Sequence, residues 1–385
     1  MLELIDEWGP EKVVMVSDRR TGMKGVLVID NTALGMGKGG TRMSPTLTVD
    51  EVARLARTMT WKWAVSGLFH GGAKAGIRSD PSAPDKEAVL RAFARRLANE
   101  VPSEYVFGLD MGLTENDAAI ISDELGRGSA VGLPAELGGL PYDQLGITGF
   151  GVAEATDAAA QSSGLTMQGA RVAIQGFGAV GVAAGLRLVA LGATVTAIAT
   201  SKGTLVAPDG LDVERLVSLR NDEGHGDEVV AVYDDPSAHH VPDASAVLDV
   251  PVDILVPAAR EDVIHHDVAR RTTAQLVVEG ANMPTTPEAR AILHERGVIL
   301  VPDFIANAGG IVAAAFSMDA RHSAFATDPD RVFASVSATM RSNTRTVLDE
   351  SARTGSAPHE AAWGLAQDRV RTAMTLRGQV TGEAR

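Results

Sequence analysis

Three lysines in the first third of the chain lie in settings that favour chemistry over simple surface charge. Glycines stand close on both sides of Lys38 and Lys74, and Lys62 follows Leu55 by seven residues, which puts a charge on the buried face of an expected helix. Glycine lets a small molecule approach the backbone, and lysine is seldom buried without a partner. Ammonium groups that share a cleft disfavour one another's charge, which lowers a pKa toward neutrality, and together they attract a carboxylate. The three lysines are therefore candidates for catalysis and substrate binding.

An aspartate and the buried lysine each have two interpretations. Asp110 lies in a loop among apolar residues, where it is either the acid that completes the lysine cluster or the N-cap of the next helix. Lys62, taken alone, would run its stem along the surface and pair its ammonium with an acid. The grouping of three such lysines in one stretch favours the catalytic interpretation.

A glycine-rich turn in the middle of the chain has the pattern of a dinucleotide-binding loop: Gly176-Phe177-Gly178-Ala179-Val180-Gly181. It lies between an expected strand at 171–175 and an expected helix at 180–191, which is the context that the fingerprint requires. The first glycine permits the tight turn, the second lets a pyrophosphate approach, and the third lets helix and strand pack closely. The alternative is a purely structural turn.

The end of the next expected strand bears on the choice of cofactor. A carboxylate that binds the ribose hydroxyl usually stands there, but this chain reads Thr200-Ser201-Lys202. A missing carboxylate with a nearby Lys202 would tolerate a 2′-phosphate, so the sequence predicts NAD or NADP. Lys202 is equally well interpreted as an ordinary surface lysine. The acidic stretch 221–228 is expected to form a solvated loop.

Hydrophobic periodicity divides the chain into three regions. An α/β domain is expected over 1–142, with an extended stretch at 25–30 and a helix that begins at a capping box, Thr48 to Glu51. Over 143–310, strands at 171–175, 193–199, 254–256, 276–278 and 298–301 alternate with helices, which predicts a doubly wound parallel sheet of the Rossmann type. Residues 311–385 are expected to form helices that return to the first domain.

Composition excludes several classes of protein. The chain has 385 residues, a net charge of -14 and no cysteine, so disulfide frameworks and thiolate metal sites are excluded, and no contact with nucleic acid is expected. The nine histidines show no metal-ligand spacing, and we expect no metal. No apolar run of eighteen residues and no signal peptide are present, which predicts a cytoplasmic protein without a membrane span.

Several motifs together identify a family resemblance. They are Gly39-Gly40-Thr41-Arg42, Met59-Thr60-Trp61-Lys62, Gly71-Gly72-Ala73-Lys74, Asp80-Pro81, Thr148-Gly149, Val278-Glu279-Gly280-Ala281-Asn282-Met283-Pro284-Thr285-Thr286 and Asn307-Ala308-Gly309-Gly310. Across about residues 25–371 the chain resembles the glutamate/leucine/phenylalanine/valine dehydrogenase family. The resemblance implies an oxidoreductase that deaminates an L-amino acid to the 2-oxo acid with NAD or NADP, and a homo-oligomer.

The resemblance also implies residue roles. Lys62 would bind the α-carboxylate, Lys74 with a lowered pKa would activate water, and Asp110 would exchange protons with the amino group. The remaining substrate positions would be Lys38, Gly39, Gly40, Asn307 and Ala314. The cofactor positions outside the glycine-rich turn would be Thr148, Thr200, Ser201, Lys202, Ala258, Ala259, Asn282 and Asn307. A cleft between the domains would open and close around the substrate.

The chain departs from the family at a few positions. Trp63 stands where the family usually has Asn, and Phe107 and Leu109 replace residues that are often proline. The stretch 142–147 lacks the usual Arg-x-Glu-Ala pattern, and the N-terminal region is short, so the family's oligomeric states do not transfer directly. None of these changes removes a proposed catalytic group.

Two positions favour different substrates. Relatives that use glutamate have lysine at the position of Lys38, and usually a serine where this chain has Ala314. If Lys38 points into the pocket, a glutamate-like substrate is favoured, because an unpaired buried ammonium costs several kcal/mol. If it turns outward to a surface acid, an apolar amino acid is favoured.

Two other functions stay open on the sequence. A catalytically silent dinucleotide-binding regulator would keep the fold, but would have no need of Lys62, Lys74 and Asp110 together. A hydroxy-acid dehydrogenase would need a histidine base paired with an acid, and His70 is the one histidine beside the lysine cluster.

Overall fold

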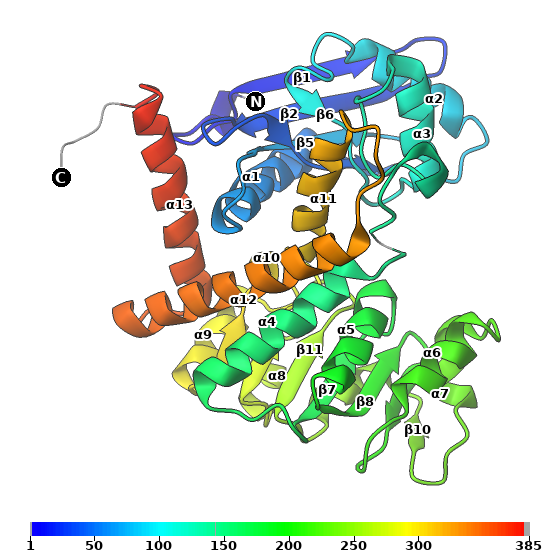
Figure 1. Ribbon diagram of the computed structural model, residues 1–385, viewed down its shortest axis with the longest axis vertical. Coiled ribbons are helices and arrows are strands. Elements are labelled where there is room, and N and C mark those ends of the chain that lie inside the picture. Colours follow the sequence, from blue (N-terminus) through cyan, green and yellow to red (C-terminus); the bar gives the residue numbers. More distant parts are fainter. Residues whose placement is uncertain (1, 143, 381–385) are drawn as a thin grey trace. The chain divides into compact units, whose positions relative to one another are not determined.

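The computed structural model describes residues 2–142 and 144–380, which fold into two compact units (Figure 1). Within these residues, unit 1 comprises the chain up to 141 together with 311–332 and the part from 364 onward. Unit 2 comprises 142–310 and 333–363. Each unit has its own sheet, and each is described separately below.

A mixed sheet forms the centre of unit 1. Its strand order is β1-β2-β5-β3-β6, with β4 paired to β5. β2 is antiparallel to β1 and β5, while β3, β4 and β6 pair in parallel. The strands are β1 (Lys12–Ser17), β2 (Lys24–Asn31), β3 (Gly37–Lys38), β4 (Thr41–Met43), β5 (Gly71–Ile77) and β6 (Tyr105–Val106).

Helices cover both faces of this sheet because strand side chains alternate between its two sides. Val26 and Val28 of β2 pack on one side with Val52 and Ala56 of α1 (Val49–Val65). Leu27 and its neighbours pack on the other side with α2 (Lys86–Arg96) and α3 (Glu115–Leu125). Helix α1 begins at the predicted cap, where the Thr48 hydroxyl accepts the backbone N–H of Glu51 at 3.2 Å.

Helix α1 lies unusually close to β5. A Cβ atom at Gly72 would stand 2.0 Å from the Thr60 hydroxyl and 2.3 Å from the Thr60 nitrogen. Glycine at position 72 therefore permits the close packing of helix and strand that brings the two lysine motifs together.

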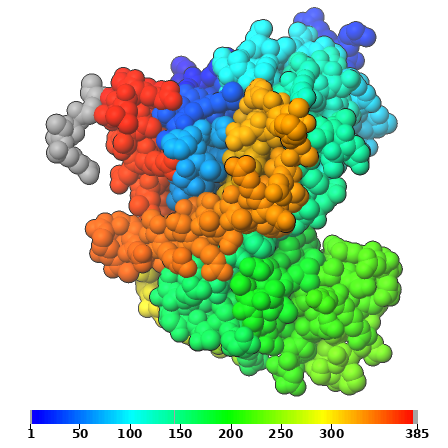
Figure 2. All heavy atoms as spheres, viewed as in Figure 1, coloured from blue at the N-terminus to red at the C-terminus, as the bar shows by residue number. Residues whose placement is uncertain are grey.

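The C-terminal helices divide between the units, whereas the sequence predicted a single return to the first domain. Helix α11 (Gly309–Ala320) and α13 (Pro358–Leu376) contribute most of their length to unit 1, where residues 311–332 lie against the segment around 127 in the space-filling view (Figure 2). Most of α12 (Pro329–Thr354) belongs to unit 2. Its Val336 and Met340 pack on Gly151, and Arg341 forms an ion pair with the buried Glu154.

The seven-stranded sheet of unit 2 has the order β10-β9-β8-β7-β11-β12-β13. The pairs from β8 to β13 are parallel, which confirms the predicted doubly wound sheet, while β9 and β10 add an antiparallel edge. The strands are β7 (Arg171–Gln175), β8 (Thr194–Thr200), β9 (Gly203–Val206), β10 (His239–Val241), β11 (Ile254–Pro257), β12 (Leu276–Val278) and β13 (Ile299–Val301).

Helices also flank the sheet of unit 2 on both faces. Ile174 of β7 packs toward α5, while Ala173 belongs to the core that α8 and α9 share with the sheet. The helices are α4 (Ile147–Ser163), α5 (Ala179–Ala190), α6 (Val213–Asn221), α7 (Val229–Val232), α8 (His266–Arg271), α9 (Pro287–Glu295) and α10 (Asp303–Ala306). Among the described residues, no helix is both long and apolar enough to cross a membrane.

Candidate active site

Lys74 and Asp110 form an ion pair in unit 1. The Lys74 Nζ on β5 lies 2.6 Å from Asp110 Oδ2, and Arg42 Nε on β4 lies 3.2 Å from the same oxygen. Burial would raise the pKa of Asp110, but the charges of Lys74 and Arg42 outweigh it and lower this pKa to about 2. Helix α3 is capped by Thr114, so the interpretation of Asp110 as the helix cap is wrong.

Lys38 is buried and contacts backbone oxygens in place of a carboxylate. Its Nζ donates to the carbonyl of Val106 at 3.1 Å and to that of Gly39 at 3.3 Å. Burial, together with the positive charges of Arg321 and Lys74, lowers the pKa of Lys38 to about 7. Among the described residues, no acid lies within ion-pairing distance of Lys38, so the lysine does not turn outward to a surface acid. Burial is the largest cause, so the lowered pKa of Lys38 does not arise chiefly from repulsion within the lysine cluster.

Lys62 lies half-buried in the last turn of α1, the helix that packs on the strand of Lys74. The neighbouring Trp63 is fully buried, and its indole N–H donates to the carbonyl of Lys38 at 3.0 Å. This tryptophan, which departs from the family pattern, therefore fixes the backbone that carries Lys38.

The two glycines after Lys38 are needed for close packing. A Cβ at Gly39 would stand 1.7 Å from the carbonyl oxygen of Ala73, and one at Gly40 would stand 2.3 Å from that of Leu109. These contacts explain both glycines structurally, and any role in substrate binding would fall to their backbone.

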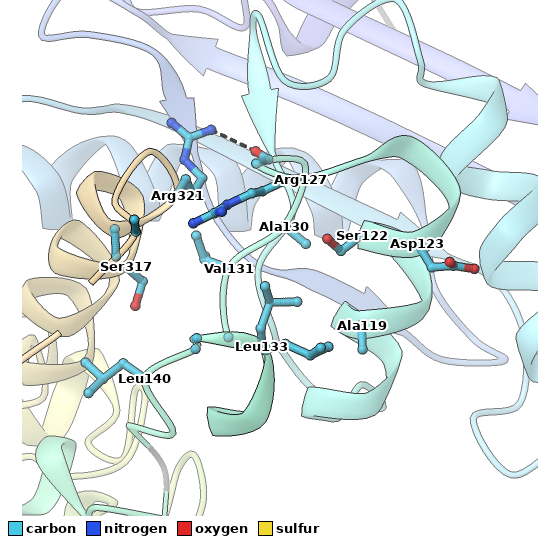
Figure 3. Close-up of a pocket in the computed structure, with 17 residues that line it drawn as sticks. Ala119, Ser122, Asp123, Arg127, Ala130, Val131, Leu133, Leu140, Ser317 and Arg321 are labelled. Carbon is cyan, nitrogen blue, oxygen red and sulfur yellow. Dashed lines mark hydrogen bonds between the residues drawn. The ribbon is translucent and has the colours of Figure 1, made fainter. Parts of the chain in front are cut away.

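A cavity of about 500 Å³ in unit 1 was not predicted from the sequence (Figure 3). Arg127 and Arg321 line it together with apolar side chains such as Val131 and Leu140. Arg321 donates to the carbonyl oxygens of Gly128 at 2.9 Å and Met318 at 3.0 Å, and Arg127 donates to that of Ser323. Within the described residues, neither guanidinium has a carboxylate at ion-pairing distance.

The positive charge of Arg321 is one of the causes that lower the pKa of Lys38. Arg321 follows Ala314 by seven residues, which is two helical turns. This spacing from a proposed substrate residue is the sequence feature that could have identified Arg321. Ala314 itself lies half-buried in α11. Ser317, one turn after Ala314, lines the cavity and donates its hydroxyl to the carbonyl of Ala313 at 3.1 Å.

The predicted cofactor loop of unit 2 fits a dinucleotide. Gly176 has a φ of 99°, and a Cβ at Gly181 would stand 1.9 Å from the carbonyl oxygen of Gly176. The Cβ position of Gly178 has no atom within 4 Å, so a pyrophosphate can approach the backbone there. The following residues Ala179 and Val180 open α5, whose first N–H groups can hold an anion. Phe177 is buried in the core, so its backbone alone is available to a cofactor.

Residues after β11, β12 and β13 form the other side of the cofactor half-site. The N–H of Ala258 donates to the Gln175 carbonyl at 2.7 Å, and Ala259 packs against Gly176. The Asn307 side-chain amide donates to Asn282 Oδ1 at 3.1 Å. Thr148 opens α4, and its hydroxyl lies 3.0 Å from the Cβ position of Gly310.

The end of β8 differs from the prediction. The sequence has no carboxylate at 200–202, but two acids from the stretch 221–228 reach this point in space. The Ser201 hydroxyl donates to Asp227 Oδ2 at 2.8 Å, and Lys202 Nζ lies 3.0 Å from Glu228 Oε1. The strand end itself has no carboxylate, as the sequence indicates, but two carboxylates from a different segment lie beside it.

Among the described residues, no group of three histidine or acidic side chains is placed to hold a metal.

The comparison with known proteins covers nearly the whole chain. The family model for Glutamate/Leucine/Phenylalanine/Valine dehydrogenase matches residues 138–378, and the Glu/Leu/Phe/Val dehydrogenase dimerisation domain matches residues 10–127. The chain is 36% identical over 367 residues to glutamate dehydrogenase of Thermotoga maritima, with 92% of this chain and 86% of the relative covered.

Two further proteins show the same similarity. NADP-specific glutamate dehydrogenase of Saccharolobus shibatae is 33% identical, with 96% and 90% of the two chains covered. The structure of hetero-hexameric glutamate dehydrogenase from Thermus thermophilus in its Leu-bound form superposes with a TM-score of 0.83 at 32% identity, covering 96% and 90%.

Proposed function

The chain belongs to the glutamate/leucine/phenylalanine/valine dehydrogenase family, and from this premise we propose that it deaminates L-glutamate oxidatively and reversibly to the 2-oxo acid and ammonia, with NAD or NADP. The observation that carries the choice of substrate is the buried Lys38, which has no carboxylate partner among the described residues. An acidic substrate side chain would supply the missing partner of Lys38. Two of the similar proteins are named as glutamate dehydrogenases, which agrees with this choice.

The proposed roles of the side chains follow from their charges. Lys62 binds the α-carboxylate of the amino acid. Lys74 activates the water that attacks the imino carbon, and its Nζ, 2.6 Å from Asp110, can pass a proton directly to that carboxylate. Asp110 is ionised at neutral pH because its pKa lies near 2. We infer that this carboxylate exchanges protons with the substrate amino group, which lies beside it in the proposed complex.

The half-site for the cofactor lies in unit 2. When bound, the nicotinamide cofactor supplies the acceptor for the hydride of the substrate Cα. The glycine-rich loop would hold its pyrophosphate, while Thr148, Asn282 and Asn307 would orient its nicotinamide end. The mutual hydrogen bond of the two asparagines supports that role, because it fixes the direction of their amides.

A glutamate-like substrate also fits the local charge. Lys38 and Arg321 are both positive in their ordinary states, and Arg321 has no ion-pair partner among the described residues. A carboxylate bound by Lys38 would raise the fraction of charged lysine, because an adjacent negative charge favours the ammonium. Substrate binding would therefore be coupled to uptake of a proton by Lys38.

An apolar amino acid is the second candidate, and two observations favour it. Ala314 lacks a hydroxyl, and Lys38 with a pKa of about 7 can stay neutral in the absence of a carboxylate. A neutral amine costs much less to leave buried than an ammonium.

The deciding experiment measures reduction of NAD and NADP by the purified protein with glutamate, aspartate, leucine, valine, norvaline and phenylalanine. We expect glutamate to give the highest kcat/KM, and Lys38→Leu to shift the preference toward leucine or norvaline. An unchanged profile in Lys38→Leu would reject the role of this lysine. Absence of turnover with every amino acid would favour the silent regulator.

Assembly and location complete the proposal. We expect a homo-oligomer, because residues 10–127 match a domain whose family description is a dimerisation domain, and the Thermus thermophilus relative is a hetero-hexamer. A cytoplasmic location is consistent with a chain that has no cysteine and needs no oxidising compartment.

A further inference from the structure

The end of β8 is where a Rossmann unit binds the adenosine ribose. The N–H of Gly176, the first glycine of the cofactor loop, donates to the carbonyl of Ala199 at 3.0 Å, so Thr200 and Ser201 directly follow the residue that anchors the loop. In such units a carboxylate at this point binds the ribose hydroxyls of NAD, and a cation there accommodates the 2′-phosphate of NADP. The charges around 200–202 should therefore decide between the two cofactors.

Two acids from a different segment occupy this position. They lie in η3 (Gly226–Glu228), which precedes α7. Asp227 is attached to the strand end twice, because its backbone carbonyl accepts the Thr200 hydroxyl at 2.7 Å and its carboxylate accepts the Ser201 hydroxyl at 2.8 Å. Glu228 Oε1 contacts Lys202 Nζ at 3.0 Å and raises the pKa of that lysine.

Resting on the proposed function, we propose that Asp227 supplies the ribose-binding carboxylate and that Asp227 and Glu228 together make the enzyme prefer NAD to NADP. The chain thus replaces the carboxylate missing at the strand end with one from a loop that packs beside it. The Ser201 hydroxyl donates to Asp227, so its oxygen would accept a second hydrogen bond from the ribose.

The local charge balance supports this choice. Lys202 contributes one positive charge, and Asp227 and Glu228 contribute two negative charges, so the sum is negative by one. A phosphate monoester carries about 1.5 to 2 negative charges and would meet net repulsion there. The ribose hydroxyls of NAD would instead donate to Asp227.

Lys202 can exchange Glu228 for a phosphate, because both side chains are about half exposed, at 49% and 54%. An exposed ion pair is weak and easily exchanged. That movement would nevertheless leave two carboxylates beside the phosphate, with one lysine to offset them. We therefore expect discrimination on the order of tenfold or more in favour of NAD.

The test measures binding of NADH and NADPH through nicotinamide fluorescence, without an amino acid. We expect NADH to bind the unaltered protein at least about tenfold more tightly than NADPH. Equal affinity, or tighter binding of NADPH, overturns the inference. If NADH is preferred but no amino acid is turned over, the proposed function fails while the inference stands. If glutamate is deaminated equally well with both cofactors, the inference about cofactor preference fails while the proposed function stands.

Variants assign the effect to the two acids. Asp227→Asn should weaken NADH binding about tenfold and reduce the ratio of the two affinities toward one. Glu228→Gln should strengthen NADPH binding roughly fivefold by releasing Lys202, and adding Lys202→Gln should reverse that gain. The side chains of Lys202, Asp227 and Glu228 are all exposed, so these substitutions are not expected to unfold the protein.

Glu223→Gln is the matched control. It removes an exposed acid of the same stretch, which contacts His225 and not the end of β8, and it should leave the affinity ratio unchanged within about twofold. A ratio that stays the same in Asp227→Asn, or that falls equally in Glu223→Gln, contradicts a specific role for Asp227.

Discussion

At the scale of single residues, the pair Lys74 and Asp110 is the feature with the clearest chemical consequence. Its short Nζ to Oδ2 distance and the contact of Arg42 with the same oxygen keep Asp110 ionised. The proton that moves during the proposed reaction therefore has a defined acceptor beside the proposed water-activating lysine.

We predict that Lys74→Ala lowers kcat with glutamate by about a thousandfold, since loss of a general acid or base typically costs a factor of 10² to 10⁴. NADH binding should be unchanged, because the cofactor loop lies in unit 2. Steady-state kinetics and nicotinamide fluorescence measure the two quantities. Lys12→Ala, which removes an exposed lysine paired with Glu104, is the control. More than a tenth of the original kcat in Lys74→Ala would contradict the assigned role.

Lys38 gives a prediction about pH. With a pKa of about 7, its side chain is an ammonium below neutral pH and an amine above it. Glutarate, which has carboxylates but no amino group, should therefore bind less well as the pH rises, with Ki increasing by up to about tenfold per unit between pH 7 and 9. Inhibition kinetics across this range measure the slope.

Lys38→Arg separates this effect from other titrations. A guanidinium stays charged throughout the range, so the Ki of glutarate should become nearly independent of pH. Identical slopes in the two proteins would show that another group controls the binding of the carboxylate.

At the scale of elements, the packing of α1 on β5 places the lysine motifs. Both motifs lie within about one helix and one strand, and the contact between those elements requires a glycine at position 72. The site therefore depends on a steric condition that no polar residue reveals.

Gly72→Ala should destabilise the protein by about 2–3 kcal/mol, because the new methyl group would overlap Thr60 and force α1 away from the strand. The free energy of unfolding in urea measures the loss. Gly364→Ala in α13 is the matched control, since its Cβ position has no atom within 4 Å and alanine favours helix. Equal stability of the two variants would refute the packing argument.

At the scale of the whole molecule, the edge of the unit 1 sheet is a candidate for contact between copies of the chain. Strand β1 is an edge strand, and its Val13 and Met15 are exposed, Met15 to 58%, on the face opposite the packed Val14 and Val16. Leu2 and Ile5 extend the same apolar area. Exposed apolar edge strands are typical of association surfaces.

We predict that the protein elutes as an oligomer of the 40.2 kDa chain and that Met15→Lys shifts it toward smaller species. Light scattering coupled to size-exclusion chromatography measures the mass. Val189→Lys, at an exposed apolar position of α5, should leave the mass unchanged. A monomeric unaltered protein, or an unaffected Met15→Lys variant, would argue against this surface.

Local sequence was sufficient for features that depend on near neighbours. The glycine-rich turn was placed correctly between β7 and α5, with the helix start one residue from the prediction, because turn geometry and hydrophobic periodicity are encoded within about ten residues. The cap of α1 was predicted for the same reason. The resemblance at the lysine motifs likewise identified the family.

Contacts between distant segments were decided by the tertiary structure alone. Ser201 and Asp227 are 26 positions apart, and no periodicity connects them, so the acids beside β8 were missed. The lowered pKa of Lys38 likewise depends on burial and on Arg321, which is remote in sequence. Charge acts through space and desolvation through packing, so the sequence determined which groups were available, while the fold determined which of them meet.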